Sequence, residues 1–289
     1  MRNWLEYIPF ILFAALVRAL PRGAALALGR RLGLLGRRLL PGRARLASTN
    51  LARAFPEKSA TEREAILVAM FGHLGTGFVE MLRLDQLRGT AELKRDFVVV
   101  GEDHVRTALA AGRGCILLTG HVGFWEAGNF IFSALGYPIG VVAKPMRNPL
   151  IDAYFLRMRE AAGGYIISSR KGARRILKAL QQNHLVGILL DQHAGRTHGV
   201  QVPFFDRPAW TTPIIAEIAM KYQIPVVPAF AWWLSDHRYH LEISPPLQLA
   251  GELTAERVKE NTALLTSYIE EAVRRDPSQW FWVHRRWRD

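Results

Sequence analysis

The chain has 289 residues, of which 49% are hydrophobic and 22% charged. This composition favours one large folded domain, with or without a terminal appendage, and excludes intrinsic disorder of the whole chain; the single cysteine, Cys115, excludes an intrachain disulfide and a zinc ribbon. The formal net charge of +13 indicates an anionic partner or substrate, such as a nucleic acid or a membrane surface.

The positive charge is concentrated at the N-terminus. Residues 1–58 carry eleven Lys and Arg side chains but only two Glu. No recognisable nucleic-acid-binding module accompanies them, so a membrane is favoured over nucleic acid as the partner. A pair of core helices with a solvated arginine face is the alternative interpretation of this segment.

Two apolar stretches support membrane association. Residues 4–20 are apolar apart from Glu6 and Arg18, but Glu6 and Pro9 make the stretch borderline for a span, which needs roughly 20 apolar residues. Residues 23–40 predict an amphipathic helix with leucines on one side and paired arginines on the other. That composition is typical of helices that lie in a membrane interface. The segment is therefore predicted to associate with a membrane, either spanning it or lying flat.

The remainder, residues 59–289, is predicted to form one domain. Residues 61–87 predict a helix, with Thr61 as its N-cap and Glu64 at the spacing of a capping box. Amphipathic segments, among them a helix predicted at 171–183, then alternate with short apolar runs. These runs lack alternating polarity, as expected for parallel strands buried on both faces. They are residues 97–100, 115–120, 139–143, 165–168 and 185–190.

The last third of the domain departs from this alternation. Residues 191–210 are predicted to be irregular, and a helix follows from about residue 211 to 221. A pair of strands and a final amphipathic helix come next, at residues 224–234, 238–245 and 254–275. The whole pattern predicts an α/β fold with a mostly parallel central sheet flanked by helices.

The candidate chemistry lies after the second predicted strand. Ligands collect beyond the carboxyl ends of parallel strands, and His121 follows there in the sequence GHVGFWE. A histidine can act as a general base because its ordinary pKa, about 6.5, is close to working pH. A carboxylate at its other ring nitrogen would fix the tautomer. Glu126 is the acid of this box, and the spacing needs a turn that Gly123 would allow.

Further candidates lie outside the box. Asp191 leaves the strand predicted at 185–190 and enters a glycine-containing loop at the same edge of the sheet. Arg157 and Arg159 lie in the amphipathic segment before the fourth strand, where an exposed, ion-paired helix face is the alternative. Arg285, Arg286 and other arginines of the C-terminal tail are suited to phosphate groups, since guanidinium forks bind phosphate oxygens bidentately.

Several other chemistries lack their motifs. The sequence contains no G-x-S-x-G elbow, no phosphate-binding glycine loop after a strand and no H-E-x-x-H. The histidines and aspartates of 191–210 do not have metal-site spacing, so neither a metal nor a cofactor is expected. Cys115 begins a predicted buried strand and is interpreted as a core residue.

The box GHVGFWE, Arg157, the block LLDQHAGRTHGVQVPFFDRPAWTT and the ending QWFWVHRRWR together resemble the bacterial late lipid A acyltransferases. These are lauroyl- and myristoyl-transferring enzymes of the lysophospholipid acyltransferase superfamily, and the resemblance covers nearly the whole chain. It implies transfer of a fatty acyl chain from a thioester to a hydroxyl of a lipid acceptor, in lipopolysaccharide biosynthesis at the cytoplasmic face of the bacterial inner membrane. The acyl donor would be acyl carrier protein, or possibly acyl-CoA.

The resemblance also implies roles for the candidate residues. His121 would deprotonate the acceptor hydroxyl and Glu126 would orient it, while Asp191 and Arg157, or its neighbour Arg159, would also be needed for activity. Arg159, Gly123, Arg285 and Arg286 are assigned to binding an anionic lipid acceptor, which is a lipid A precursor or a related glycolipid. Two alternatives are a non-catalytic protein that binds anionic membranes or nucleic acid, and a lipid hydrolase that uses the same histidine with water.

Overall fold

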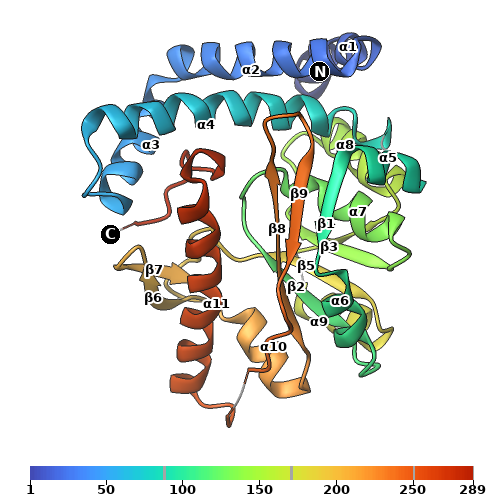
Figure 1. Ribbon diagram of the computed structural model, residues 1–289, viewed down its shortest axis with the longest axis vertical. Coiled ribbons are helices and arrows are strands. Elements are labelled where there is room, and N and C mark those ends of the chain that lie inside the picture. Colours follow the sequence, from blue (N-terminus) through green and yellow to red (C-terminus); the bar gives the residue numbers. More distant parts are fainter. Residues whose placement is uncertain (87–88, 170–171, 250, 289) are drawn as a thin grey trace.

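A seven-stranded sheet between layers of helices forms the centre of the protein (Figure 1). The structure is a computed structural model that describes residues 1–86, 89–169, 172–249 and 251–288. The last residue of the helix predicted at 61–87 and the first of the helix predicted at 171–183 lie outside the described residues. The strands are β1 (Phe97–Val100), β2 (Cys115–Thr119), β3 (Ile139–Ala143), β4 (Tyr165–Ser168), β5 (Leu185–Leu189), β8 (Val226–Trp233) and β9 (Tyr239–Ile243).

The sheet is mostly parallel, as the sequence predicted. Its strand order is β1-β9-β8-β2-β5-β3-β4. The five strands from β8 to β4 pair in parallel, β9 is antiparallel to β8, and β1 is parallel to β9. β2 and β5 are direct neighbours in register, with Thr119 opposite Leu189. The two strands therefore deliver the residues that follow them to the same place.

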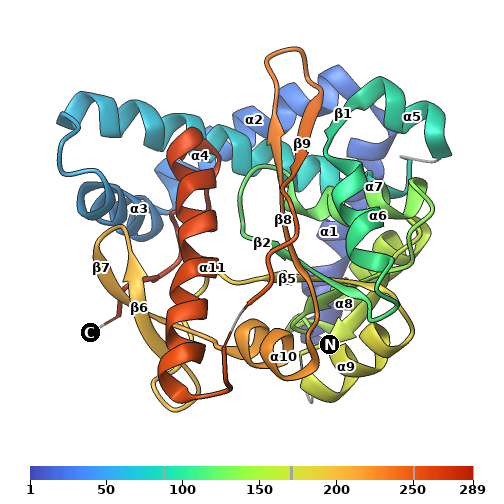
Figure 2. The same ribbon diagram turned by 60° about the horizontal axis from the view of Figure 1, so that its bottom comes forward.

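Both faces of the sheet are buried, which explains the uninterrupted apolar runs. On β2, Cys115 and Leu117 belong to one core, and Ile116 and Leu118 to the other. Figures 1 and 2 both place α11 on one side of the sheet and α6 on the other. Helices α6 (Glu102–Leu109) and α7 (Gly128–Ala134) cover the first face. Helices α9 (Gly172–Gln181), α10 (Ile214–Tyr222) and α11 (Ala255–Arg275) cover the second.

The stretch predicted to be irregular contains a hairpin. Val200–Phe204 and Arg207–Thr211 form the antiparallel strands β6 and β7. Their two-residue connection, Phe205 and Asp206, has positive φ at both positions, as a type I′ turn requires. The prediction was wrong here because this turn usually carries Asn-Gly, and Phe-Asp gives no such signal.

Five α-helices of the described residues precede β1: α1 (Arg2–Ala19), α2 (Arg22–Leu39), α3 (Pro41–Ala54), α4 (Ala60–Met81) and α5 (Gly89–Asp96). α4 starts two residues earlier than predicted, because Ser59 and Glu62 form the capping box. α1 packs on α8 (Pro149–Ala161) through Phe10, whose ring lies 5.1 Å from that of Tyr154. None of the described helices combines the length and apolarity that a membrane span requires.

A seam of glycines joins α2 to α4, which run side by side in Figure 1. A Cβ built on Gly33 would lie 1.9 Å from the Phe71 carbonyl oxygen, and one on Gly75 would lie 2.0 Å from that of Gly29. The two backbones therefore approach more closely than any side chain at these positions allows. As a consequence, small residues of α2 are buried, and leucines of the same helix, among them Leu32 and Leu35, are exposed.

The seam generates a test of this packing. Gly75→Ala introduces a methyl group against backbone atoms that cannot yield, and is expected to lower the free energy of unfolding by about 1–3 kcal/mol. Gly77→Ala on the same helix meets nothing within 4 Å and is expected to be neutral or to stabilise by up to about 1 kcal/mol. Denaturant titration measures both variants. Equal effects would show that the helices are not in close contact.

Candidate active site

His121 and Asp191 meet at the carboxyl edge of the sheet. Each lies two residues beyond a paired position of the neighbouring strands β2 and β5. The Nδ1 atom of His121 lies 2.8 Å from Oδ1 of Asp191. Asp191 is buried, and the His121 side chain is 19% exposed, so the carboxylate is shielded while the ring remains accessible.

Asp191 is held as an ionised carboxylate. Its Oδ2 accepts hydrogen bonds from the backbone N–H of His121, at 2.8 Å, and from the indole N–H of Trp280, at 2.7 Å. Burial alone would raise the pKa of this carboxyl, but the charge of His121 and these hydrogen bonds outweigh burial and lower the pKa to about 2. The carboxylate therefore remains charged at any pH at which the protein would work.

The charged partner fixes the tautomer of His121. An ionised carboxylate only accepts hydrogen bonds, so Nδ1 carries a proton, and in the neutral imidazole the lone pair is therefore on Nε2. The side-chain nitrogen of Gln192 lies 3.1 Å from this Nε2 atom. The ring thus presents a basic nitrogen on the side away from Asp191, which is the arrangement that a general base needs.

The structure corrects the predicted pairing of His121 with Glu126. Both Glu126 oxygens accept from Arg159 instead, at 2.9 Å from its Nε and 2.7 Å from its Nη2. Both side chains of this pair are largely buried. The five-residue spacing put Glu126 near His121 in the chain. The short 3₁₀ turn Trp125–Ala127, however, directs the Glu126 carboxylate to α8, while Asp191 arrives from the adjacent strand.

The two arginines of α8 have different surroundings. Arg159 is partly buried and points to Glu126, whereas Arg157 is exposed. Residues two positions apart on a helix point in directions about 200° apart, so Arg157 and Arg159 cannot share a face. Of the two, the structure brings Arg159, the second choice of the sequence analysis, into the site.

A polar cavity of about 420 Å³ opens beside His121. Glu126, Arg159, Lys144 and Gln192 are also among its lining residues. His121 and Glu126, although they do not form the expected pair, therefore face the same space. The cavity combines a basic nitrogen with cationic and amide side chains, which suits a polar or anionic substrate group.

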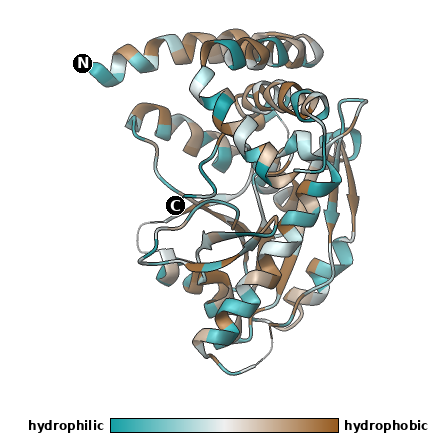
Figure 3. Cartoon of the chain, turned by 90° about the vertical axis from the view of Figure 1, so that its left-hand side faces the viewer, coloured by the Kyte–Doolittle hydropathy of each residue, from teal (hydrophilic) through white to brown (hydrophobic). Residues whose placement is uncertain are grey.

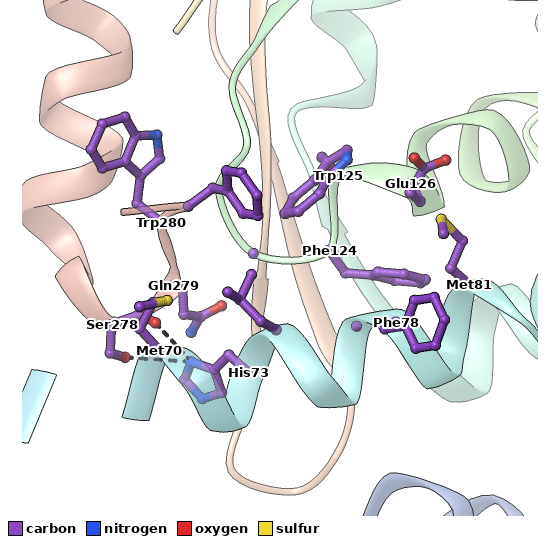
Figure 4. Close-up of a pocket in the computed structure, with 14 residues that line it drawn as sticks. Met70, His73, Phe78, Met81, Phe124, Trp125, Glu126, Ser278, Gln279 and Trp280 are labelled. Atoms are coloured by element: carbon purple, nitrogen blue, oxygen red, sulfur yellow. Dashed lines mark hydrogen bonds between the residues drawn. The ribbon is translucent and has the colours of Figure 1, made fainter. Parts of the chain in front are cut away.

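A second, apolar cavity of about 200 Å³ adjoins the first. It lies between α4 and the segment after β2, and Trp125 and Glu126 border both cavities. Figure 4 shows Trp125 above α4, Phe124 beside Phe78 of that helix, and Met81 beside Glu126. Its polar corner is His73, whose Nδ1 lies 3.1 Å from the Ser278 carbonyl oxygen.

Gly123 shapes the backbone between these cavities. It has a φ of +57°, and a Cβ there would lie 1.8 Å from the Ala231 carbonyl oxygen. Its N–H donates to the carbonyl oxygen of Gln279 at 2.8 Å. The residue borders the apolar cavity, but its conformation and close contacts explain why glycine is required here.

The C-terminal tail buries one of the two arginines assigned to substrate. Arg286 is fully buried and donates to the carbonyl oxygens of Gln192 and Trp210 and to the hydroxyl of Thr211. Burial lowers the pKa of this guanidinium to about 10. The assignment of Arg286 to an anionic substrate is therefore corrected to a structural one, whereas Arg285 is exposed.

Comparisons with known proteins identify the family. The family described as bacterial lipid A biosynthesis acyltransferase matches residues 1–289. The lipid A biosynthesis lauroyltransferase of Escherichia coli is 29% identical over 99% of this chain and 92% of its own. The palmitoleoyltransferase of the same organism is 28% identical over 93% and 86%.

The 1-acyl-sn-glycerophosphate acyltransferase structure from Thermotoga maritima covers 84% of this chain and 96% of its own, at 13% identity and a TM-score of 0.39.

The chain belongs to the bacterial lipid A biosynthesis acyltransferase family. The resemblance drawn from the sequence is confirmed, and with it the prediction of an O-acyltransferase. Membership also decides against the non-catalytic alternative.

Two residues that contact the histidine–aspartate pair were not predicted from the sequence. Gln192 directly follows Asp191, and Trp280 stands in the aromatic tail; their only signal was membership of the two quoted blocks.

The tail generates a prediction on stability. Arg286→Ala removes the donor to one buried acceptor, the Thr211 hydroxyl, and to two partly buried carbonyl oxygens, and it opens a cavity beside Phe204. The free energy of unfolding is therefore expected to fall by at least about 2 kcal/mol. Arg285→Ala, at the exposed neighbouring position, is expected to change it by less than about 0.5 kcal/mol. Denaturant titration compares the two, and similar values would contradict the structural role of Arg286.

Proposed function

We propose that this protein is a membrane-associated acyltransferase that moves a fatty acyl chain from a thioester to a hydroxyl of a lipid A precursor or a related glycolipid. The observation that carries the proposal is the bond between Nδ1 of His121 and the buried Asp191 carboxylate, which leaves Nε2 as a base beside a polar cavity. Family membership supports the reaction class.

The mechanism follows from this geometry. The acceptor hydroxyl gives its proton to Nε2 of His121 as its oxygen attacks the thioester carbonyl carbon. Asp191 holds the ring and stabilises the imidazolium that forms. When the tetrahedral intermediate collapses, the ester is released and the departing thiolate takes the proton from the imidazolium. The base is then restored.

The pair of Glu126 and Arg159 takes a positioning role in this proposal. Glu126 neutralises and orients a largely buried guanidinium at the cavity wall, rather than orienting His121. Arg159 replaces Arg157 as the arginine of the site. A cation at this position suits the phosphate-bearing part of a donor or acceptor.

The apolar cavity is proposed to receive the acyl chain. Three of its lining residues, Leu74, Phe78 and Phe281, also border a second apolar cavity of about 560 Å³, which is lined on its other side by Leu32 of α2 and by Leu40. An apolar route thus connects the surface of α2 with the space beside Trp125. The ring of Trp125 in turn lies 5.0 Å from that of His121.

The anionic parts of the substrates are proposed to meet the exposed arginines. A cavity of about 980 Å³ at the turn between α2 and α3 is lined by Arg43, Arg45, Arg285 and Arg288. This cluster supports an anionic lipid acceptor. Acyl carrier protein, or possibly acyl-CoA, remains the proposed donor.

Residues 1–58 are proposed as the membrane-associating segment, and 59–289 as the catalytic domain. Ten of the sixteen exposed large apolar side chains among the described residues lie in the first 40 residues. On α1 they include Leu5, Leu12 and Leu16, spaced to share one face. Figure 3 shows the helix that begins at the N-terminus along one edge of the molecule, with apolar residues in brown. The proposed location is the cytoplasmic face of the bacterial inner membrane.

A catalytic test addresses the base and its partner. His121→Ala removes the base, and Asp191→Asn favours the tautomer with the proton on Nε2, so each is expected to lower acyl transfer by roughly 10²–10⁴-fold in detergent micelles. Mass spectrometry of the acylated lipid follows the reaction.

Asp206→Asn is the control, because this exposed turn residue has a positive φ that asparagine accepts. Full activity of either test variant would refute the mechanism. Release of free fatty acid without acceptor dependence would favour the hydrolase.

A membrane test addresses the N-terminal segment. The double variant Leu12→Glu and Leu16→Glu is expected to weaken binding to vesicles that contain anionic phospholipid by more than tenfold, since burying each leucine contributes about 1.5–3 kcal/mol. Leu264→Glu, on an exposed leucine of α11, is the control. Vesicle co-sedimentation measures all three proteins. Equal binding of the double variant and the wild type would exclude this face as the anchor.

A further inference from the structure

The side chain of Gln192 occupies the position that the acceptor hydroxyl needs. Its amide nitrogen lies 3.1 Å from Nε2 of His121 and, because Nδ1 carries the ring proton, donates to the Nε2 lone pair. The proposed mechanism requires that same lone pair to accept the hydroxyl proton. The amide must therefore leave Nε2 when the acceptor arrives. Rotation of the Gln192 side chain is then enough to bring the amide to the reacting atoms.

The backbone of Gln192 is fixed while its side chain is exposed. Arg286 donates to the Gln192 carbonyl oxygen, and on its N-terminal side Asp191 is held by three hydrogen bonds. The N–H of Leu190 donates to Thr119 of the neighbouring strand. The Gln192 amide can consequently rotate about its own side-chain bonds without disturbing the histidine–aspartate pair.

Several other donors around the base already have partners. The backbone N–H of His121 donates to Asp191, that of Gly123 to Gln279, and that of Phe124 to Ala231. Nε and Nη2 of Arg159 both donate to Glu126. The backbone N–H groups of these three residues are thus committed, whereas the Gln192 amide nitrogen bonds to an atom that must be vacated.

We propose, resting on the proposed acyl transfer, that Gln192 is a catalytic residue that stabilises the oxyanion. In the resting state its amide caps Nε2 of His121. The acceptor hydroxyl displaces the amide, which then donates to the carbonyl oxygen of the thioester. The alcohol oxygen bonds to the carbonyl carbon and its proton passes to Nε2. At the same time the electron pair of the C=O bond moves to the carbonyl oxygen, which becomes the oxyanion. It returns when the carbon–sulfur bond breaks, and the thiolate takes the proton.

The kinetic test uses three variants of the full-length protein. Gln192→Ala and Gln192→Glu both remove the donor and are expected to lower kcat by roughly 10²–10³-fold, with the KM for the acceptor changed less than threefold. Gln201→Ala, on an exposed residue of β6, is the matched control and is expected to retain wild-type kcat. Unchanged or higher kcat in Gln192→Ala would overturn the proposal, because a residue that merely blocks the base would slow the reaction when present.

A binding test separates this proposal from the proposed function. A long-chain alkyl phosphonate imitates the tetrahedral oxyanion, and the ketone analogue of the thioester imitates the planar ground state. Calorimetry is expected to show at least tenfold weaker phosphonate binding by Gln192→Ala and unchanged ketone binding. Equal loss for both ligands, or for neither, would overturn the role of Gln192. Absence of transfer by the wild type would instead refute the proposed function, and the phosphonate comparison would still decide the role of Gln192.

Discussion

The hydrogen bond between His121 and Asp191 is the interaction on which the site depends. A carboxylate that is removed from water is costly unless it is paired, and here the ring, a backbone N–H and an indole N–H all donate to it. These three donors contribute to the low pKa of Asp191. Parallel pairing of β2 and β5 brings the two residues together before any loop is considered, because Thr119 and Leu189 are in register. The pair is thus a consequence of strand order, and its surroundings only have to supply the remaining donors.

Those surroundings come from the end of the chain. Trp280 donates to Asp191, and Arg286 ties the backbone of Gln192 to the end of the β7 strand. His284 accepts from the backbone N–H of His193, and burial lowers its pKa to about 4, so that it remains a neutral acceptor. The tail therefore closes over the loop that carries Asp191. Adjacent residues of the tail have different roles: Arg286 is buried and packs in the interior, whereas Arg285 is exposed to solvent.

Much of this architecture could be predicted from the sequence, because parallel strands buried on both faces leave uninterrupted apolar runs and ligands collect beyond their ends. His121 and Asp191 were found in this way. The partner of the histidine was not, since sequence spacing reports distance along the chain, whereas the order of β2 and β5 is decided by packing. The exposure of Arg157 and the glycine seam between α2 and α4 likewise depend on which helix face meets a neighbour, and the burial of Arg286 depends on how the irregular tail packs. The hairpin was not predicted, because the pair Phe205 and Asp206 does not have the residue types that usually indicate a turn with two positive φ angles.

The route of the lipid places a constraint on how the proposed base meets its acceptor. Removing one methylene from an apolar environment costs about 0.8 kcal/mol, so lifting a chain of a dozen carbons through water would cost roughly 10 kcal/mol. A cavity that continues an apolar surface avoids this cost. The glycine seam has this effect, because close approach of α2 to α4 leaves Leu32, Leu35 and Leu39 of α2 exposed, while Leu74 and Phe78 of α4 border both apolar cavities. The packing that positions α4 over the sheet edge would thereby also connect the base to the surface that is proposed to bind the membrane.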